Sequence, residues 1–238
     1  MFSDIAADVA SLIFPRTCPV CGAAMPRNGG VVCTMCEITA PLTNLWLERG
    51  NAMEQRFWGL MPVDAASAFF WFVEGSAWRN VVHRFKYSGA WRTAYELGRW
   101  YGACMKQGGL YDAVDVVVPV PLHPRRLIAR GYNQSEHLAD GIARELGVGV
   151  ERGCMRRHRY NASQTRQSSH GRWENVEGIF SVRRSERLAG RHVLLVDDVF
   201  TTGATMISCG SALLAAAEGV RLSVATLAVS RKSLGIKP

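Results

Sequence analysis

Residues 193–205 read Val-Leu-Leu-Val-Asp-Asp-Val-Phe-Thr-Thr-Gly-Ala-Thr, and they decide the fold class of this chain. The apolar residues 193–196 show no polar alternation, which is typical of a strand buried on both faces. The apolar, alanine-rich run 206–217 predicts a helix. A strand, an acidic pair, a short hydroxyl-rich loop and a helix in this order predict an α/β fold, in which ligands bind at the carboxyl ends of parallel strands.

The side chains between this strand and this helix predict a site for a phosphorylated sugar. Asp197 and Asp198 would accept hydrogen bonds from vicinal sugar hydroxyls. The loop offers hydroxyls and backbone N–H groups to a phosphate, and its glycine lets the backbone approach closely. The loop residues are Thr201, Thr202, Gly203, Ala204 and Thr205. The alternative is an ordinary strand followed by an N-capped helix, since Asp and Thr are common caps.

Four cysteines predict a small metal-binding module near the N-terminus. Cys18, Cys21, Cys33 and Cys36 form two C-x-x-C pairs separated by eleven residues. Two such pairs suit one tetrahedral Zn²⁺ with no open position, which indicates a structural ribbon. Asn28-Gly29-Gly30 predicts a hairpin turn between the pairs. Two disulfides are the competing interpretation, which a reducing cytoplasm disfavours.

Length and charge restrict the organisation of the chain more than its function. The 238 residues allow one large domain and a small module. A net charge of +8 favours anionic partners, but an enzyme that handles phosphates and a protein that binds nucleic acid would both show it. Residues 1–15 show helical apolar spacing without a basic start, and no run is long enough to span a membrane. We therefore expect a cytoplasmic protein with an N-terminal helix (1–15), a ribbon (16–40), a connector (41–64) and an α/β domain (65–238).

A second anion site is predicted after the apolar run 114–118. Pro119, Val120 and two further prolines form a stiff loop there, because proline cannot continue a strand ladder. The arginines that follow bind phosphate oxygens well; they are Arg125, Arg126 and Arg130. Lys86, at the end of a predicted helix 78–87, is another candidate phosphate contact. A proline-rich surface turn with solvated arginines is the alternative.

The stretch 152–175 is rich in arginine and lacks apolar periodicity, which predicts a long loop or mobile flap. Such a flap, with Arg166 and Arg172, could close over a leaving group and exclude water. A basic arm that binds nucleic acid is an equally good interpretation of this composition. Further helices are predicted at 91–106 and 135–146, and strands at 65–73, 179–182 and 222–229.

Residues 193–205 resemble the phosphoribosyl-pyrophosphate motif of type I phosphoribosyltransferases. Together with the cysteine ribbon and the sequence Arg-Gly-Tyr-Asn-Gln at 130–134, the chain resembles the ComF family of bacterial competence proteins (ComFC and GntX-like) from residue 18 to residue 229. The resemblance implies a type I phosphoribosyltransferase fold with a flap, preceded by a zinc ribbon. It also implies that the loop after strand 114–118 receives pyrophosphate.

The implied activity is transfer of a phosphoribosyl group to a nitrogen acceptor, in nucleotide salvage or DNA uptake. Mg²⁺ and the arginines would stabilise the departing pyrophosphate, with Asp197, Asp198 and Arg130 as the catalytic residues. The alternative is a non-catalytic DNA-uptake factor that binds single-stranded DNA and competence-machinery proteins through its basic flap and ribbon. The acceptor and the oligomeric state are not encoded in these motifs.

Overall fold

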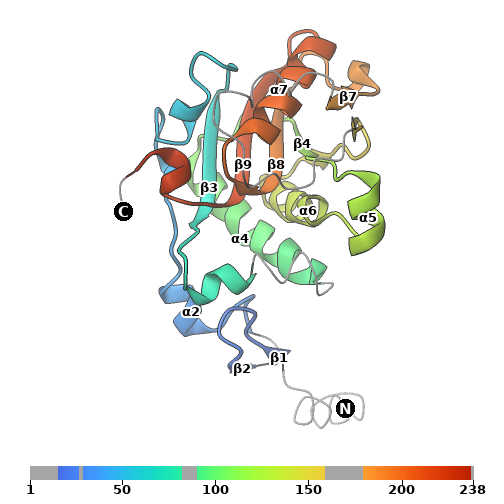
Figure 1. The fold of residues 1–238 in the computed structure, drawn as a ribbon. Helices are drawn as coiled ribbons and strands as arrows, with labels where there is room; N and C mark the ends of the chain where they lie inside the picture. The colour runs from blue at the N-terminus through green and yellow to red at the C-terminus, as the bar shows by residue number, and fades with distance from the viewer. Residues whose placement is uncertain (1–15, 27–28, 82–89, 159–178, 237–238) are drawn as a thin grey trace.

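The computed structural model describes residues 16–26, 29–81, 90–158 and 179–236. Its centre is a five-stranded, all-parallel sheet in the order β3-β9-β8-β4-β5 (Figure 1). The strands are β3 (Ala65–Trp71), β4 (Val116–Pro119), β5 (Gly149–Val150), β8 (His192–Phe200) and β9 (Arg221–Val229). The predicted α/β class with a parallel sheet flanked by helices is therefore confirmed.

Helices cover both faces of this sheet, which explains why its strands carry unbroken apolar runs. Helices α4 (Trp91–Gly108) and α6 (Gln134–Leu146) pack together on one face, and α7 (Ala204–Ala216) covers the other (Figure 1). Alternate residues of β8 pack on opposite faces of the sheet. Leu194 belongs to the cluster on the side of α4 and α6, Leu195 belongs to the cluster on the side of α7, and both are fully buried. This is the burial pattern expected of a parallel strand.

Three expectations about the elements of the α/β domain are wrong. Strand β8 does not end at residue 196 but continues through Asp197 and Asp198 to Phe200, because β9 pairs with it over this whole length. The predicted arginine-lined loop is largely a helix, α5 (Pro124–Arg130), with its proline in the first turn where a missing N–H costs nothing. The stretch 152–175 begins with a short strand, β6 (Met155–Arg157), which pairs antiparallel with β7 (Phe180–Val182).

The other predicted elements are present within one to three residues, where they are described. Residues 77–81 are helical, and the rest of the predicted helix 78–87 lies outside the described residues. Residues 1–15 also lie outside them. Within the described ranges, no helix combines the length and the apolar character needed to cross a membrane.

The cysteine module contains a hairpin, but not where the sequence predicted it. Strands β1 (Arg16–Thr17) and β2 (Ala24–Met25) enclose the first cysteine pair, and α2 (Thr34–Ile38) carries the second. Asn28 of the predicted turn lies outside the described residues, and Gly29 and Gly30 lead into a coil segment and α2 rather than into a strand. The tight turn is instead at Gly22, with a φ of +78° that favours glycine.

The connector contributes to both faces of the sheet, with Trp46 in the cluster on the α4 side and Phe57 in the cluster on the α7 side. It contains two short 3₁₀ helices, η1 (Leu45–Leu47) and η2 (Glu54–Arg56). Phe57 is fully buried, and its ring packs edge-on against that of Phe200 with centroids 5.8 Å apart. Two further short turns, η4 (Ser185–Arg187) and η5 (Lys232–Leu234), complete the described elements.

Glycines allow α4 and α6 to approach each other closely, which leads to a stability prediction. A Cβ atom at Gly141 would lie 2.1 Å from the backbone oxygen of Tyr95, and one at Gly98 would lie 2.3 Å from that of Leu138. We expect Gly141→Ala to destabilise the protein by about 3 kcal/mol, because the added methyl group would force the two helix backbones apart. Thermal unfolding should show a melting temperature lower by roughly 6–12 °C. Gly149→Ala is the control, because nothing lies within 4 Å of its Cβ position; equal melting temperatures for the two variants would contradict the prediction.

Candidate functional site

The candidate site lies at the carboxyl ends of β4 and β8, where the chain connections diverge. From β4 the chain runs through α5 and α6 to β5 on one side, and from β8 it runs through α7 to β9 on the other. Adjacent parallel strands whose connections leave in opposite directions form a crevice at this edge, which is the usual ligand position in open α/β sheets. The predicted sugar-phosphate residues therefore occupy the position at which this fold binds ligands.

Asp197 and Asp198 are held in place by the first residues of α6. Ser135 Oγ donates a hydrogen bond of 2.9 Å to Asp197 Oδ1, and Gln134 Nε2 donates one of 2.9 Å to Asp198 Oδ2. The Asp198 N–H also donates to Asp197 Oδ1 at 2.9 Å. The two carboxylates are half-buried, whereas Gln134 and Ser135 are buried. Donors of fixed position thus orient both carboxylates.

Asn133 ties this arrangement to the strands. Its side chain caps α6 by accepting from the Ser135 N–H at 3.2 Å, which is the role expected of an asparagine before a helix. Its amide also donates to the Val120 carbonyl at 3.1 Å, and the Val120 N–H donates to the Val196 carbonyl at 2.8 Å. The ends of β4 and β8 and the start of α6 are therefore one connected unit.

The predicted phosphate loop is the short turn between β8 and α7. Thr201 and Thr202 are exposed, whereas Ala204 and Thr205 are half-buried in the first turn of the helix. Gly203 is buried with a φ of +82°, and a Cβ atom there would lie 2.9 Å from Phe200 Cζ. Backbone conformation and packing therefore both require glycine at this position.

The predicted pyrophosphate residues lie beside the same edge. Pro119 ends β4, Val120 follows it, and the arginines are carried by α5, with Arg125 exposed and Arg126 and Arg130 half-buried. Lys86, Arg166 and Arg172 lie outside the described residues. The aspartates and the threonine loop thus lie at the end of β8, and α5, which carries the three arginines, follows the end of the neighbouring strand β4.

Arg157 is a further cation at this edge that the sequence analysis did not assign to the site. It lies on β6, and its guanidinium is 5.4 Å from the centre of the Phe180 ring. Burial lowers the pKa of Arg157, the nearby charge of Arg126 lowers it further, and Asp197 opposes the shift. Arg157 therefore lies within electrostatic range of Arg126 and Asp197, and a half-buried guanidinium can bind an anion.

The four cysteines converge as predicted. Their Sγ atoms all lie within 4.8 Å of one another, and those of Cys21 and Cys33 are 3.6 Å apart. Tetrahedral Zn²⁺ with bonds of about 2.3 Å separates its sulfur ligands by about 3.8 Å, so the arrangement fits one such ion. Burial raises the pKa of the Cys18 thiol, but hydrogen bonds, including those from backbone groups of Cys21 and Cys33, outweigh it and lower the pKa to about 6. Burial raises the pKa of Cys36.

Parts of this chain are similar to known proteins. Residues 133–236 match the phosphoribosyl transferase domain family. The chain is 37% identical over 100 residues to DNA utilization protein YhgH of Salmonella typhi, covering 42% of this chain and 43% of that protein. It is 26% identical over 215 residues to competence protein ComFC of Bacillus subtilis, covering 88% of this chain and 76% of that protein.

A solved structure of glutamine phosphoribosylpyrophosphate amidotransferase from B. subtilis matches 60% of this chain and 30% of its own, with 21% identity and a TM-score of 0.40. The match with YhgH spans less than half of that protein's length. The chain is thus similar to competence and DNA-utilization proteins, and its residues 133–236 match the phosphoribosyl transferase domain family.

Proposed function

We propose that this protein binds phosphoribosyl pyrophosphate with Mg²⁺ and transfers the 5-phosphoribosyl group to a nitrogen acceptor. The observation that carries the proposal is the pair Asp197 and Asp198, oriented by Gln134 and Ser135 at the switch point between β4 and β8. A carboxylate pair of fixed orientation beside a glycine turn and a helix N-terminus suits a ribose that carries a 5′-phosphate.

Each group of residues has a distinct role in this proposal. Residues 201–205 bind the 5′-phosphate through hydroxyls and the first N–H groups of α7, which positions the substrate. The aspartates accept hydrogen bonds from the ribose hydroxyls and offset positive charge that develops on the ring. The arginines of α5 face the pyrophosphate, and Lys86, Arg166 and Arg172 remain part of the proposal.

The reaction breaks the bond between C1 of the ribose and the pyrophosphate oxygen and forms a bond from C1 to nitrogen. The bonding electron pair leaves with the pyrophosphate, and the acceptor nitrogen releases its proton to solvent. Charge therefore accumulates on the leaving group, where Arg125, Arg126 and Arg130 stabilise it electrostatically. Bound Mg²⁺ would supply additional charge neutralisation at the pyrophosphate.

The cysteine cluster is proposed to hold a structural Zn²⁺, since all four positions of a tetrahedral ion would be filled by sulfur. We further propose a cytoplasmic location and a role in competence or nucleotide salvage. The division into ribbon (16–40), connector (41–64) and transferase domain (65–238) belongs to the same proposal.

Pyrophosphate release tests the proposed activity. Zinc-loaded protein is incubated with phosphoribosyl pyrophosphate, Mg²⁺ and each of several nitrogen acceptors: ammonia, purine bases and pyrimidine bases. Acceptor-dependent release supports the proposal. Absence of release with every acceptor, together with salt-sensitive binding of single-stranded DNA that is lost on replacing the flap arginines, would instead support the non-catalytic alternative.

We expect Thr205→Val to raise the KM for phosphoribosyl pyrophosphate about tenfold and to change kcat little. The hydroxyl is proposed to contact the 5′-phosphate, which does not react, so its contribution is the same in the ground state and the transition state. Steady-state kinetics check this, with Thr93→Val on α4 as the control. A fall in kcat at constant KM would contradict the positioning role.

We expect Gln134→Leu to weaken phosphoribosyl pyrophosphate binding by about tenfold, since a hydrogen bond to a charged group contributes about 1.5–3 kcal/mol. The variant keeps the side-chain size but removes the donor that orients Asp198. Calorimetry measures the affinity, and Gln107→Leu at an exposed position of α4 is the control. Unchanged affinity in a folded Gln134→Leu protein would show that this hydrogen bond is not needed.

A further inference from the structure

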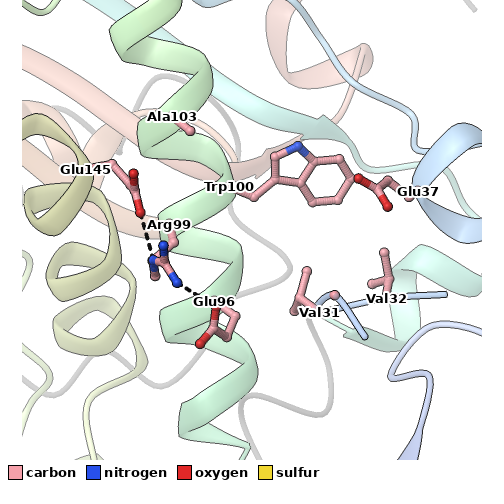
Figure 2. A pocket seen from close by; sticks show the side chains of 9 residues that line it. Val31, Val32, Glu37, Glu96, Arg99, Trp100, Ala103 and Glu145 are labelled. Atoms are coloured by element: carbon pink, nitrogen blue, oxygen red, sulfur yellow. Dashed lines mark hydrogen bonds and ion pairs between the residues drawn. The ribbon is translucent and has the colours of Figure 1, made fainter. Parts of the chain in front are cut away.

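A groove of about 290 Å³ lies where the cysteine module meets α4 and α6 (Figure 2). It shares no residue with the site at the ends of β4 and β8. The groove draws its charged residues from three elements: Glu37 from α2, Glu96 and Arg99 from α4, and Glu145 from α6. Its size is at the lower end of the range of ligand pockets, and an amino-acid side chain fits within it.

The groove carries a surplus of negative charge. Its lining carries three carboxylates and one guanidinium, that of Arg99, which pairs with two of the carboxylates. The Arg16 guanidinium lies at the edge of the groove, where it donates to the Gly30 carbonyl at 3.3 Å. Arg99 Nε donates to Glu145 Oε1 at 2.7 Å, and Arg99 also lies 3.6 Å from Glu96. Glu37 takes no part in these contacts. Its exposed carboxylate has no hydrogen bond or ion pair to any described residue. In a chain of net charge +8, this is a locally acidic surface.

Trp100 gives the groove an aromatic wall. Its indole is half-buried and packs edge-on against Phe69, with centroids 5.1 Å apart and planes at 85°. The Glu37 carboxylate and the Trp100 indole line the same groove (Figure 2). Val31 and Val32 add apolar surface next to them. A groove lined by an indole, a carboxylate and aliphatic side chains can accommodate a side chain whose alkyl stem ends in a cation.

We propose that this groove binds an arginine or lysine side chain presented by a basic segment of a partner protein. The sign of the charge excludes a nucleic-acid backbone as the occupant, because phosphates would meet unneutralised carboxylates. It also disfavours the chain's own residues 1–15, which contain two aspartates and no lysine or arginine. A Zn²⁺ ion held by four thiolates would leave two negative charges beside Glu37 and strengthen the preference for a cation.

The proposal is tested by calorimetry on the full-length, zinc-loaded protein. The probe is the peptide acetyl-Ala-Leu-Arg-Leu-Ala-amide, and the matched probe carries citrulline, which has the same shape without the charge. We expect the arginine peptide to bind and the citrulline peptide to bind at least about tenfold more weakly. Raising the salt concentration should weaken binding of the arginine peptide, since the groove is open to solvent and its charges are screened.

Glu37→Gln is the deciding variant because this exposed residue can change without disturbing the core. It should reduce the affinity for the arginine peptide about tenfold. Glu74→Gln, which replaces an exposed acid elsewhere, should leave that affinity unchanged. Equal binding of both peptides, or no binding at about 1 mM, would overturn the proposal. Self-association that Glu37→Gln abolishes would assign the groove to a second copy of the chain and overturn the choice of partner. None of these measurements involves phosphoribosyl pyrophosphate, so this proposal and the proposed function can fail independently.

Discussion

Replacing Asp197 and Asp198 together by asparagine is expected to reduce the affinity for phosphoribosyl pyrophosphate by a factor of about 10²–10⁴. Each carboxylate is proposed to accept hydrogen bonds from a ribose hydroxyl, and a hydrogen bond to a charged group contributes about 1.5–3 kcal/mol. Asparagine preserves the shape of both side chains, so the fold and the buried strand β8 should be retained. Calorimetric titration with Mg²⁺ present measures the loss.

The matched control is the double variant Asp112→Asn, Glu74→Gln, which removes the same number of negative charges from exposed positions. It should bind phosphoribosyl pyrophosphate as the unmodified protein does. If the control loses as much affinity as the Asp197 and Asp198 variant, the effect arises from overall charge and not from the site. If neither loses affinity, the carboxylates do not hold the ribose.

Removal of the metal is expected to unfold the cysteine module and to lower the melting temperature of the whole chain by about 10 °C or more. Cys18 and Cys36 are buried, and the module's apolar residues share one cluster with Trp46 and Tyr101 of the main body. Loss of the module therefore exposes part of the core beneath α4. Chelation followed by calorimetric melting, with zinc content measured by atomic absorption, checks the prediction.

A pair of cysteine variants separates metal loss from general damage. Cys18→Ser should lose the bound zinc and reproduce the effect of chelation, because serine is a poor ligand for Zn²⁺. Cys104→Ser, a half-buried cysteine of α4 outside the cluster, should keep one zinc per chain. Zinc retention by Cys18→Ser with an unchanged melting temperature would show that the four cysteines do not form a structural site.

The elements that sequence reasoning predicts well are those governed by a local pattern. The unbroken apolar run at residues 193–196 predicts a buried strand because a strand with one solvent-facing side would alternate with polar residues, and all four residues are fully buried. The two C-x-x-C pairs likewise predict convergence, since each pair alone forms half of a tetrahedron. In both cases adjacent residues carry the information.

The features that the sequence does not predict depend on contacts between distant residues. Gln134 and Ser135 lie more than sixty positions from the aspartates that they orient, so their role appears only once α6 is placed against β8. The signal available beforehand was Asn133, a typical N-cap before an apolar helix. The length of β8 is also a tertiary effect, since pairing with β9 carries the strand past its acidic pair.

The groove beside Trp100 could not be predicted from the sequence either, because its three carboxylates come from the separate helices α2, α4 and α6. None of them belongs to a recognisable motif. The hairpin of the cysteine module was misplaced for a related reason. The glycine-rich residues 28–30 suggested a turn between strands, but the backbone reverses at the first cysteine pair, where the Gly22 N–H donates to the Cys18 carbonyl at 2.8 Å.

Titration of phosphoribosyl pyrophosphate into zinc-loaded protein with Mg²⁺ tests the central claim most directly. We predict binding at one site per chain, with competition from ribose 5-phosphate and from pyrophosphate, since the site is proposed to hold both halves of the ligand. Absence of binding heat and of any effect on melting temperature, in folded protein containing one zinc per chain, would contradict the account. The crevice between β4 and β8 would then not be a phosphoribosyl pyrophosphate site.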